Sequence, residues 1–289
     1  MIPKTSSLQN LKRRGIENHH INWRNRLVKI SLKILNFISY FLININKILS
    51  KTVFFVSDLH LGLESKEKER EKENRFVKFL NYAKSNCDEL VIVGDLFDYW
   101  FEYRKVIQKG YHKTFTALEN LTGAGIPVHY IIGNHDFMHR DFFESELGLK
   151  IYYSTFKTGY NGKKFFIDHG DDFVANDLGY KILKKILRSK IAQGLYSLIH
   201  PDLGIWLASS TSKTSREHTG SKNYSEEDGL FSKAKEIIDN GFDYVVFGHT
   251  HRIKYIAYKN GFYINLGAWL FEPVYGKFSG EVFEIIKWE

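Results

Sequence analysis

Five times along this chain, a short hydrophobic run stops and a cluster of Asp, Asn and His begins. Each run has the length and the β-branched or aromatic character of a buried strand. In α/β sheets, ligands bind outside the carboxyl ends of the strands, so clusters at these ends meet in space even when they are distant in sequence. We therefore predict an α/β fold with one convergent polar site. The clusters occupy residues 58–60, 94–98, 133–136, 168–171 and 248–251.

The segments around the clusters predict the order of the elements. Each cluster follows a predicted strand, and charged segments with an apolar face at three- and four-residue spacing predict helices between them. Hairpin-like strands close the chain. We expect strands over 52–57, 90–93, 128–132, 164–167 and 244–247, helices over 64–84, 111–122 and 226–239, and closing strands near 253–258, 262–266 and 281–287.

Composition sets limits on the class of protein and on the ligands available for a metal. The chain has 289 residues and is 43% hydrophobic, which excludes a disordered, collagen-like or low-complexity protein. Its single cysteine, Cys87, cannot form an internal disulfide or by itself build a zinc–thiolate site. Any metal must therefore be held by oxygen and nitrogen ligands, and the chain suits a reducing compartment.

The positive charge is concentrated at the N-terminus. The formal net charge is +8, and residues 1–50 contain nine basic side chains against Glu17 alone, so the rest of the chain is neutral. Duplex affinity normally rests on Lys and Arg contacts with phosphates. A neutral body therefore argues against nucleic acid as a partner. The nine basic residues are Lys4, Lys12, Arg13, Arg14, Arg24, Arg26, Lys29, Lys33 and Lys47.

Residues 27–49 have the pattern of an amphipathic helix. Apolar side chains recur at three- and four-residue spacing from Leu27 to Ile48, and Lys29 and Lys33 fall on the other side. The uncharged stretch 34–46 is interrupted by Asn and Ser, whereas a membrane-spanning helix needs about 20 predominantly apolar residues. We expect the basic extension 1–50 to lie in the interface of an anionic membrane. A helix packed on the body, an amphipathic transit peptide and an upstream start codon are the alternatives.

The clusters contain the ligand types of a two-metal site. Carboxylate, amide and imidazole ligands with few thiols suit manganese, iron or zinc. Asp58 and His60 alternate along an extended segment, so both side chains can point to the same side. Asp95 is central and has two carboxylate oxygens, which makes it the natural bridge. We assign one ion to Asp58, His60, Asp95 and His251, and the second to Asp95, Asn134, His169 and His249.

Two such ions predict a reaction class. Metals about 3.5 to 4 Å apart clamp the attacking and leaving oxygens of an in-line displacement and lower the pKa of bound water. That chemistry is the hydrolysis of phosphoesters or phosphoanhydrides. His135 is next to Asn134, where it can contact the phosphate or protonate the leaving group, and Asp98 could orient its ring.

The ordered clusters resemble the calcineurin-like metallophosphoesterase superfamily. The resemblance covers roughly residues 52–289. It implies an α/β/β/α four-layer sandwich with two divalent ions at its edge, and Mn²⁺ is the expected metal. It also implies a metallophosphoesterase domain over 51–289. The motifs that carry it are Asp58-Leu-His60, Gly94-Asp95-Leu-Phe-Asp98, Gly133-Asn134-His135-Asp136, His169-Gly170-Asp171 and Gly248-His249-Thr250-His251.

Within that superfamily, the chain is most similar to the UDP-2,3-diacylglucosamine diphosphatases of lipid A biosynthesis. The segments Ser57–Gly62 and Gly94–Trp100 and a helical insertion, about 176–216, carry this similarity. It implies that water attacks the α-phosphorus, which releases UMP and 2,3-diacylglucosamine 1-phosphate, and that the insertion caps the acyl chains. Two departures stand out: many members have Arg at the position of His135, and the 50-residue extension exceeds their usual start.

The resemblance also implies where the substrate binds and where the protein acts. A UDP-linked acylated glucosamine is the expected substrate, and no protein partner is predicted. The expected location is the cytoplasm, peripheral to the inner face of a bacterial inner membrane. The implied substrate-binding residues are Asn134, His135, Asp177, Ser212, Lys213, Arg216 and His249.

Two other functions remain open at this point. A metallophosphoesterase acting on soluble nucleotides or phosphoproteins would use the same metals and would not need an apolar cap. A non-catalytic metal-binding scaffold could retain the fold, although the complete ligand set and His135 argue against it.

Overall fold

The computed structural model describes residues 50–174, 185–207 and 229–289. Residues 51–289 belong to one compact unit. The predicted helix over 27–49 lies outside the described residues, as do parts of the predicted insertion.

Three of the five predicted strands that end in a polar cluster belong to one sheet. Strands β1 (Val53–Val56), β2 (Glu89–Val93) and β3 (Val128–Ile131) run parallel, and β4 (Lys150–Tyr152) continues the parallel set. On the other side, β10 (Val274–Ser279) pairs antiparallel with β1, and β11 (Val282–Lys287) with β10. Among the described residues, this sheet has six strands in the order β11-β10-β1-β2-β3-β4.

The other two units belong to a second sheet. Strands β6 (Lys163–Ile167), β7 (Tyr244–Phe247) and β9 (Gly261–Leu266) run parallel. The edges are antiparallel, with β5 (Phe156–Tyr160) next to β6 and β8 (Ile253–Tyr258) next to β9. The predicted clusters therefore follow parallel strands in both sheets.

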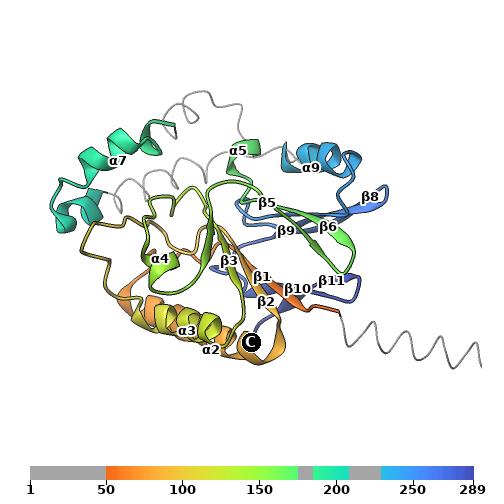
Figure 1. Ribbon diagram of the computed structural model, residues 1–289, viewed down its shortest axis with the longest axis horizontal. Helices are drawn as coiled ribbons and strands as arrows, with labels where there is room; N and C mark the ends of the chain where they lie inside the picture. The colour runs from red at the N-terminus through yellow and green to blue at the C-terminus, as the bar shows by residue number, and fades with distance from the viewer. Residues whose placement is uncertain (1–49, 175–184, 208–228) are drawn as a thin grey trace, which may run out of the picture. The chain divides into compact units, whose positions relative to one another are not determined.

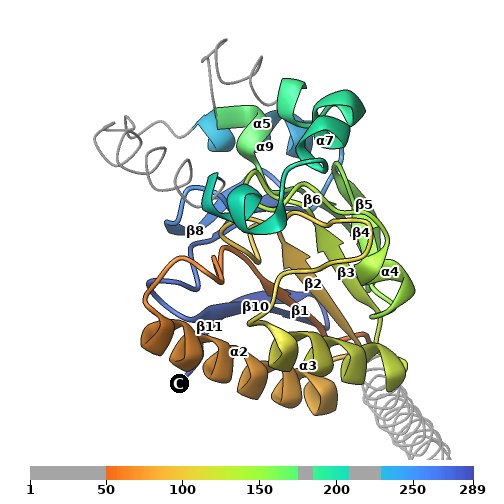
Figure 2. The same ribbon diagram turned by 90° about the vertical axis from the view of Figure 1, so that its left-hand side faces the viewer.

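Helices cover the outer faces of the stacked sheets. Figure 1 shows α2 (Lys66–Asn86) and α3 (His112–Gly123) below the six-stranded sheet and α9 (Gly229–Asp239) above the five-stranded one. Figure 2 shows the same layers from the side, with α7 (Lys190–Tyr196) beyond the ends of the strands. This α/β/β/α arrangement confirms the predicted fold class. Two one-turn helices, α4 (Phe142–Ser145) and α5 (Asp171–Val174), lie in connections.

Strand alternation explains why the central strands are hydrophobic at every position. Successive side chains of a strand point to opposite faces of the sheet. Val53 and Phe55 pack between the two sheets, whereas Phe54 and Val56 pack against the helices α2 and α3. All four side chains are fully buried. A strand covered on both faces has no solvent side, which accounts for the continuous hydrophobic run.

Most of the predicted elements agree with the structure, and the differences lie in the connections, at one edge of each sheet and at the inner strand β10. Strands β4 and β5 and helix α4, all between residues 142 and 160, were not predicted, and β10 was also missed. The strand β8 alternates between exposed and half-buried side chains, as a strand at a sheet edge does.

No helix in the described ranges 50–174, 185–207 and 229–289 combines the length and the hydropathy needed to cross a bilayer.

A buried polar cluster stabilises the end of the sheets opposite the predicted site. The Glu89 carboxylate accepts a hydrogen bond from the Tyr160 hydroxyl and lies 3.1 Å from His129 Nε2 and 3.0 Å from Lys51 Nζ. Burial raises the pKa of Glu89, but the contacts with His129, Tyr160 and Lys51 outweigh it and lower that pKa to about 2. The folded protein therefore favours the ionised carboxylate.

We expect Glu89 to contribute to the acid sensitivity of the fold. The unfolded carboxyl has a pKa of about 4.3, so the stabilisation is present above that pH and is lost as the pH falls toward 2. Glu89→Gln should lower the free energy of unfolding at pH 7 by about 1–3 kcal/mol and weaken its decrease toward pH 3. Urea unfolding at several pH values measures both effects. Glu284→Gln, at an exposed position of β11, is the control, and a variant with the wild-type pH profile would contradict this role.

Candidate functional site

The structure brings the predicted carboxylates and imidazoles into one buried cluster at the carboxyl ends of the strands. Asp95 follows β2, and its Oδ2 lies 3.2 Å from Nε2 of His169 and 3.7 Å from Nε2 of His60. Asp58 follows β1, and its Oδ1 lies 3.1 Å from Nε2 of His251 and 3.7 Å from Nε2 of His60. Asp95 therefore contacts His residues that follow strands of both sheets.

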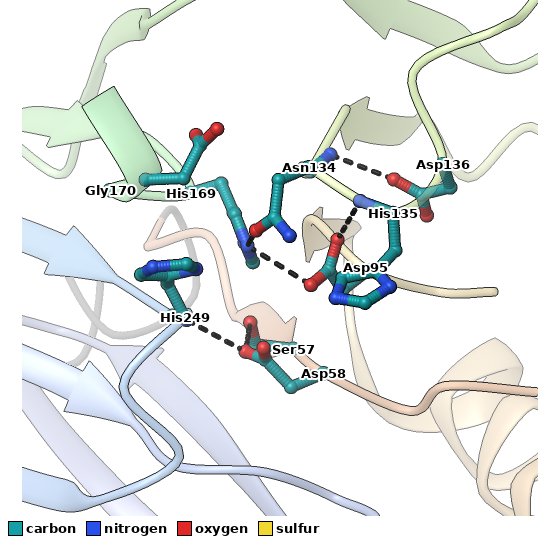
Figure 3. A network of polar contacts seen from close by, with 12 residues as sticks. Ser57, Asp58, Asp95, Asn134, His135, Asp136, His169, Gly170 and His249 are labelled. Atoms are coloured by element: carbon teal, nitrogen blue, oxygen red, sulfur yellow. Dashed lines mark hydrogen bonds and ion pairs between the residues drawn. The ribbon is translucent and has the colours of Figure 1, made fainter. Parts of the chain in front are cut away.

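The remaining two residues of the predicted ligand set lie at the same place. The Oδ1 atom of Asn134 is 3.1 Å from Nε2 of His169. The His249 ring centroid is 5.2 Å from that of His169, and the His249 backbone N–H donates to Oδ2 of Asp58 over 3.1 Å. Figure 3 shows Asn134, His169 and His249 facing the Asp58 and Asp95 carboxylates. All seven predicted ligands are thus neighbours, as the convergence of the strand ends requires.

The backbone of these residues differs from what the sequence predicts. Asp58 and His60 are not in an extended segment, because both have positive φ, at 54° and 46°. Left-handed φ is uncommon for non-glycine residues and concentrates at functional sites. Among the described residues, seven non-glycine residues have positive φ, and five of them belong to the predicted ligand set. These five are Asp58, His60, Asp95, His249 and His251.

Two glycines allow the loops to approach this closely. A Cβ at Gly133 would overlap the Asp95 carboxylate, and a Cβ at Gly248 would overlap the Ser57 hydroxyl and crowd the Asp58 carboxylate. Any side chain at either position would therefore displace a carboxylate of the cluster.

The charges of the cluster depend on one another. Burial raises the pKa of Asp58, but contacts with His251 and His60 hold it well below its usual range. For His60, burial lowers the pKa, and Asp58, Asp98 and Asp95 overcome this effect and raise it to about 9. The pKa of His169 is likewise raised above its usual value, against burial, chiefly by Asp95. The ionised form of these buried carboxylates is therefore stabilised by positive charge beside it.

The donor set fits divalent cations. Among the described residues, no donor is oriented to form a hydrogen bond with the buried Oδ1 of Asp58, which lies 3.1 Å from Nε2 of His251 and 3.7 Å from Nε2 of His60. The Nε2 atoms of His60 and His251 lie 3.1 Å apart, so at least one must carry a proton unless a cation lies beside both. A buried acceptor without a donor is costly, and a metal ion satisfies it. Within the described ranges, the groups of Asp and His whose ligand atoms lie within 4.8 Å of one another are Asp58–His60–His251, His60–Asp95–His135 and Asp58–Asp95–His169.

His135 lies at the edge of the cluster, and Asp98 contacts it mainly through the main chain. The Nδ1 atom of His135 is 2.9 Å from the carbonyl oxygen of Asp98 and 3.9 Å from its carboxylate. Because a carbonyl only accepts, Nδ1 donates, and Nε2 is the nitrogen that exchanges a proton. Burial lowers the pKa of His135. The carboxylate of Asp98 is closer to His60, at 3.6 Å from its Nδ1.

Several residues that hold the cluster received no role from the sequence. Asp136 is fully buried and accepts from the backbone N–H groups of Gly133 (2.8 Å) and Leu96 (2.7 Å), so it ties together the loops after β3 and β2. The position of Asp136 in the 133–136 motif is a sequence signal that could have identified it. Lys72, on α2, donates to the carbonyl of His60 over 2.7 Å and is only 8% exposed. The charged pattern of α2 offered no such signal, since charge runs on helices are usually solvated.

The described part of the insertion contacts a loop next to the cluster. The rings of Tyr196 on α7 and Phe101 pack with their centroids 4.4 Å apart. Residues 201–207 are helical, as predicted. Four predicted substrate-binding residues lie outside the described residues: Asp177, Ser212, Lys213 and Arg216.

Comparison with known proteins identifies the family. Residues 51–252 match the model of the calcineurin-like phosphoesterases. The chain belongs to this family. It is thus a hydrolase, of a family whose members use divalent metals, and the predicted resemblance is confirmed.

Individual relatives are similar over most of their length. A UDP-2,3-diacylglucosamine hydrolase of Porphyromonas gingivalis is 27% identical over 79% of this chain and 94% of its own. A protein of the same name from Blochmanniella pennsylvanica is 30% identical over 75% of this chain and 88% of its own. The solved structure of an archaeal phosphodiesterase aligns with 82% of this chain and 99% of its own, at 15% identity and a TM-score of 0.44.

We predict that Lys72 sets the metal affinity of the cluster through the backbone of His60. Lys72→Met removes the donor to the His60 carbonyl and should weaken Mn²⁺ binding about tenfold, as loss of a group that orients a ligand typically does. Calorimetric titration of chelator-treated protein measures this. Lys68→Met, on the same helix with a side chain 70% exposed, is the matched control. Equal affinity in the two variants would show that Lys72 has no such role.

Proposed function

We propose that this chain hydrolyses the pyrophosphate bond of UDP-2,3-diacylglucosamine. Water attacks the α-phosphorus, the bond from that phosphorus to the bridging oxygen breaks, and the products are UMP and 2,3-diacylglucosamine 1-phosphate. Relatives with the matching name support this substrate, because the similarity extends over 88–94% of their length.

The observation that carries the choice of substrate is the apolar surface of the insertion. Ile191, Leu195 and Leu198, on and just after α7, are 79%, 64% and 81% exposed. Their segment packs on the loop after Asp98 through Tyr196 and Phe101. An apolar surface beside a polar site suits an amphiphile with acyl chains at one end and phosphates at the other, whereas a soluble nucleotide needs no such surface.

Two divalent ions, which we propose to be Mn²⁺, complete the site. One would be held by Asp58, His60, Asp95 and His251, and the other by Asp95, Asn134, His169 and His249. When bound, they supply a hydroxide-like water and neutralise charge that develops on the phosphate. Two observations support the assignment: five of these residues have positive φ, and Oδ1 of Asp58 has no hydrogen-bond partner in the part of the chain that the structure describes.

The other polar residues have proposed roles in holding the substrate. We propose that Asn134, His135 and His249 contact the phosphate of the substrate at the cluster. The Asp98 carbonyl fixes the His135 ring through Nδ1, so Nε2 is the atom that would contact the phosphate or donate to the leaving oxygen. Asp177, Ser212, Lys213 and Arg216 are proposed to contact the glucosamine or the nucleotide.

The domain organisation and location follow from this function as further proposals. Residues 51–289 would form the catalytic domain, with the insertion of about 176–216 as a cap over the acyl chains. The basic extension 1–50 would hold the protein at the cytoplasmic face of the inner membrane, where a diacylated substrate resides.

The direct test of the substrate is incubation of the purified chain and Mn²⁺ with UDP-2,3-diacylglucosamine. We expect UMP to be released. If the protein hydrolyses a simple phosphodiester but releases no UMP from UDP-2,3-diacylglucosamine, the result would favour a soluble nucleotide or a phosphoprotein as the substrate.

His135→Ala tests the role of that ring. We expect turnover to fall about 10²- to 10⁴-fold, the usual contribution of a positioned acid or base, while metal content measured by elemental analysis stays nearly intact. Loss of metal from the variant would refute a role in leaving-group departure and would indicate a ligand.

Deletion of residues 1–50 tests the membrane role of the extension. Because the extension contains all of the formal net charge, we expect the truncated protein to sediment less with phosphatidylglycerol vesicles and to keep its activity on a soluble phosphodiester. If the truncated protein binds the vesicles as well as the full-length protein does, the membrane proposal is refuted.

A further inference from the structure

One cationic side chain of the insertion reaches the loops of the metal cluster. Arg188 lies between the helical residues 185–187 and α7. Its Nη2 donates to the carbonyl of Gly133 over 3.1 Å and lies 3.7 Å from the carboxylate of Asp171. The guanidinium also lies over the Phe137 ring, 5.6 Å from its centroid. The neighbouring cations Lys185 and Lys190 are exposed.

The carbonyl that Arg188 contacts belongs to the peptide that precedes Asn134. The N–H of Gly133 is held by Asp136 over 2.8 Å and its carbonyl by Arg188, so both polar groups of this residue are hydrogen-bonded to side chains. Gly133 packs against the Asp95 carboxylate. The orientation of this residue therefore sets where the side chain of Asn134 points.

The second contact joins another loop of the site. Asp171 is two residues beyond His169, is 4% exposed at its side chain, and begins α5. One guanidinium thus lies between the loop that follows β3 and the loop that follows β6. These loops come from different sheets, and each contains residues of the proposed second metal site.

The contacts of Arg188 place its guanidinium at a defined point between the two loops. The Nε atom of Arg188 is buried and has no hydrogen-bond partner among the described residues. A buried donor without an acceptor destabilises a fold, and guanidinium donors are well suited to carbonyl and carboxylate groups at fixed angles.

We propose that Arg188 is a positioning residue, which holds the loops that contain Asn134 and His169 in the geometry of the proposed second metal site. The inference rests on the metal-dependent hydrolysis in the proposed function and not on its lipid substrate. Arg188 holds the Gly133 carbonyl and the Asp171 carboxylate together. Without this contact, the loops after β3 and β6 lose a shared support, and the proposed second metal site becomes less ordered.

The test compares Arg188→Met and Arg188→Lys with the matched control Lys190→Met in the full-length protein. Bis(p-nitrophenyl) phosphate with Mn²⁺ is the probe, because it has no acyl chains to contact the insertion. We expect Arg188→Met to lower kcat about tenfold with KM changed less than about threefold, and to weaken Mn²⁺ binding in calorimetry about tenfold. Arg188→Lys should be intermediate, since Lys keeps the positive charge but its ammonium lies one bond closer to the backbone than the Nη2 atom that makes both contacts. Lys190→Met should match the wild type.

Several results would overturn the proposal. The proposal is wrong if folded Arg188→Met has the kcat and the Mn²⁺ affinity of the wild type. It is also wrong if only KM rises, because that result would indicate that Arg188 binds the substrate directly. Should the Met variant fail to fold, an Arg188→Lys protein with wild-type kcat and Mn²⁺ affinity would also exclude it. Absence of UMP from UDP-2,3-diacylglucosamine in the wild type would refute the proposed substrate and leave this comparison intact, because Mn²⁺ binding and phosphodiester turnover are measured separately.

Discussion

The structure depends on the charge balance of two buried carboxylates. Asp58 and Asp95 are 0% and 1% exposed, and a buried carboxylate is tolerated only beside compensating positive charge. His60 and His169, whose pKa values are raised, provide it through contacts of 3.2–3.7 Å. Where divalent cations bind, they take over this role. The close spacing of these groups is therefore both an electrostatic requirement of the fold and the basis of its chemistry.

Such close spacing imposes strain that the surrounding scaffold must hold. Asp58, His60 and Asp95 have left-handed backbones, which persist only where neighbouring contacts determine them. Lys72 supports the loop after β1 from a helix, and Asp136 joins the loops after β2 and β3. These groups never need to touch a substrate, yet they decide where the predicted ligands lie.

Sequence patterns predicted the central elements well because their physical causes are local. Strands covered on both faces read as hydrophobic runs, and α2 presents Phe76, Leu80 and Ala83 on one buried face. The edge strands β4 and β5, which are mostly exposed or half-buried, and the inner strand β10 were missed. The extended backbone predicted at Asp58 and His60 was wrong, because residue spacing alone does not report a left-handed φ.

The sequence by itself determined the fold class, the family and the identity of the residues that gather at the strand ends. These follow from hydrophobic periodicity and from motifs whose side chains have definite chemistry. Only the tertiary structure decided that Asp98 contacts His135 through its carbonyl, that Lys72 holds His60, and that Arg188 reaches Gly133. The reason is physical: these contacts join segments that lie 12 or more residues apart along the chain, and their partners are main-chain carbonyls, which every residue has and no sequence pattern distinguishes.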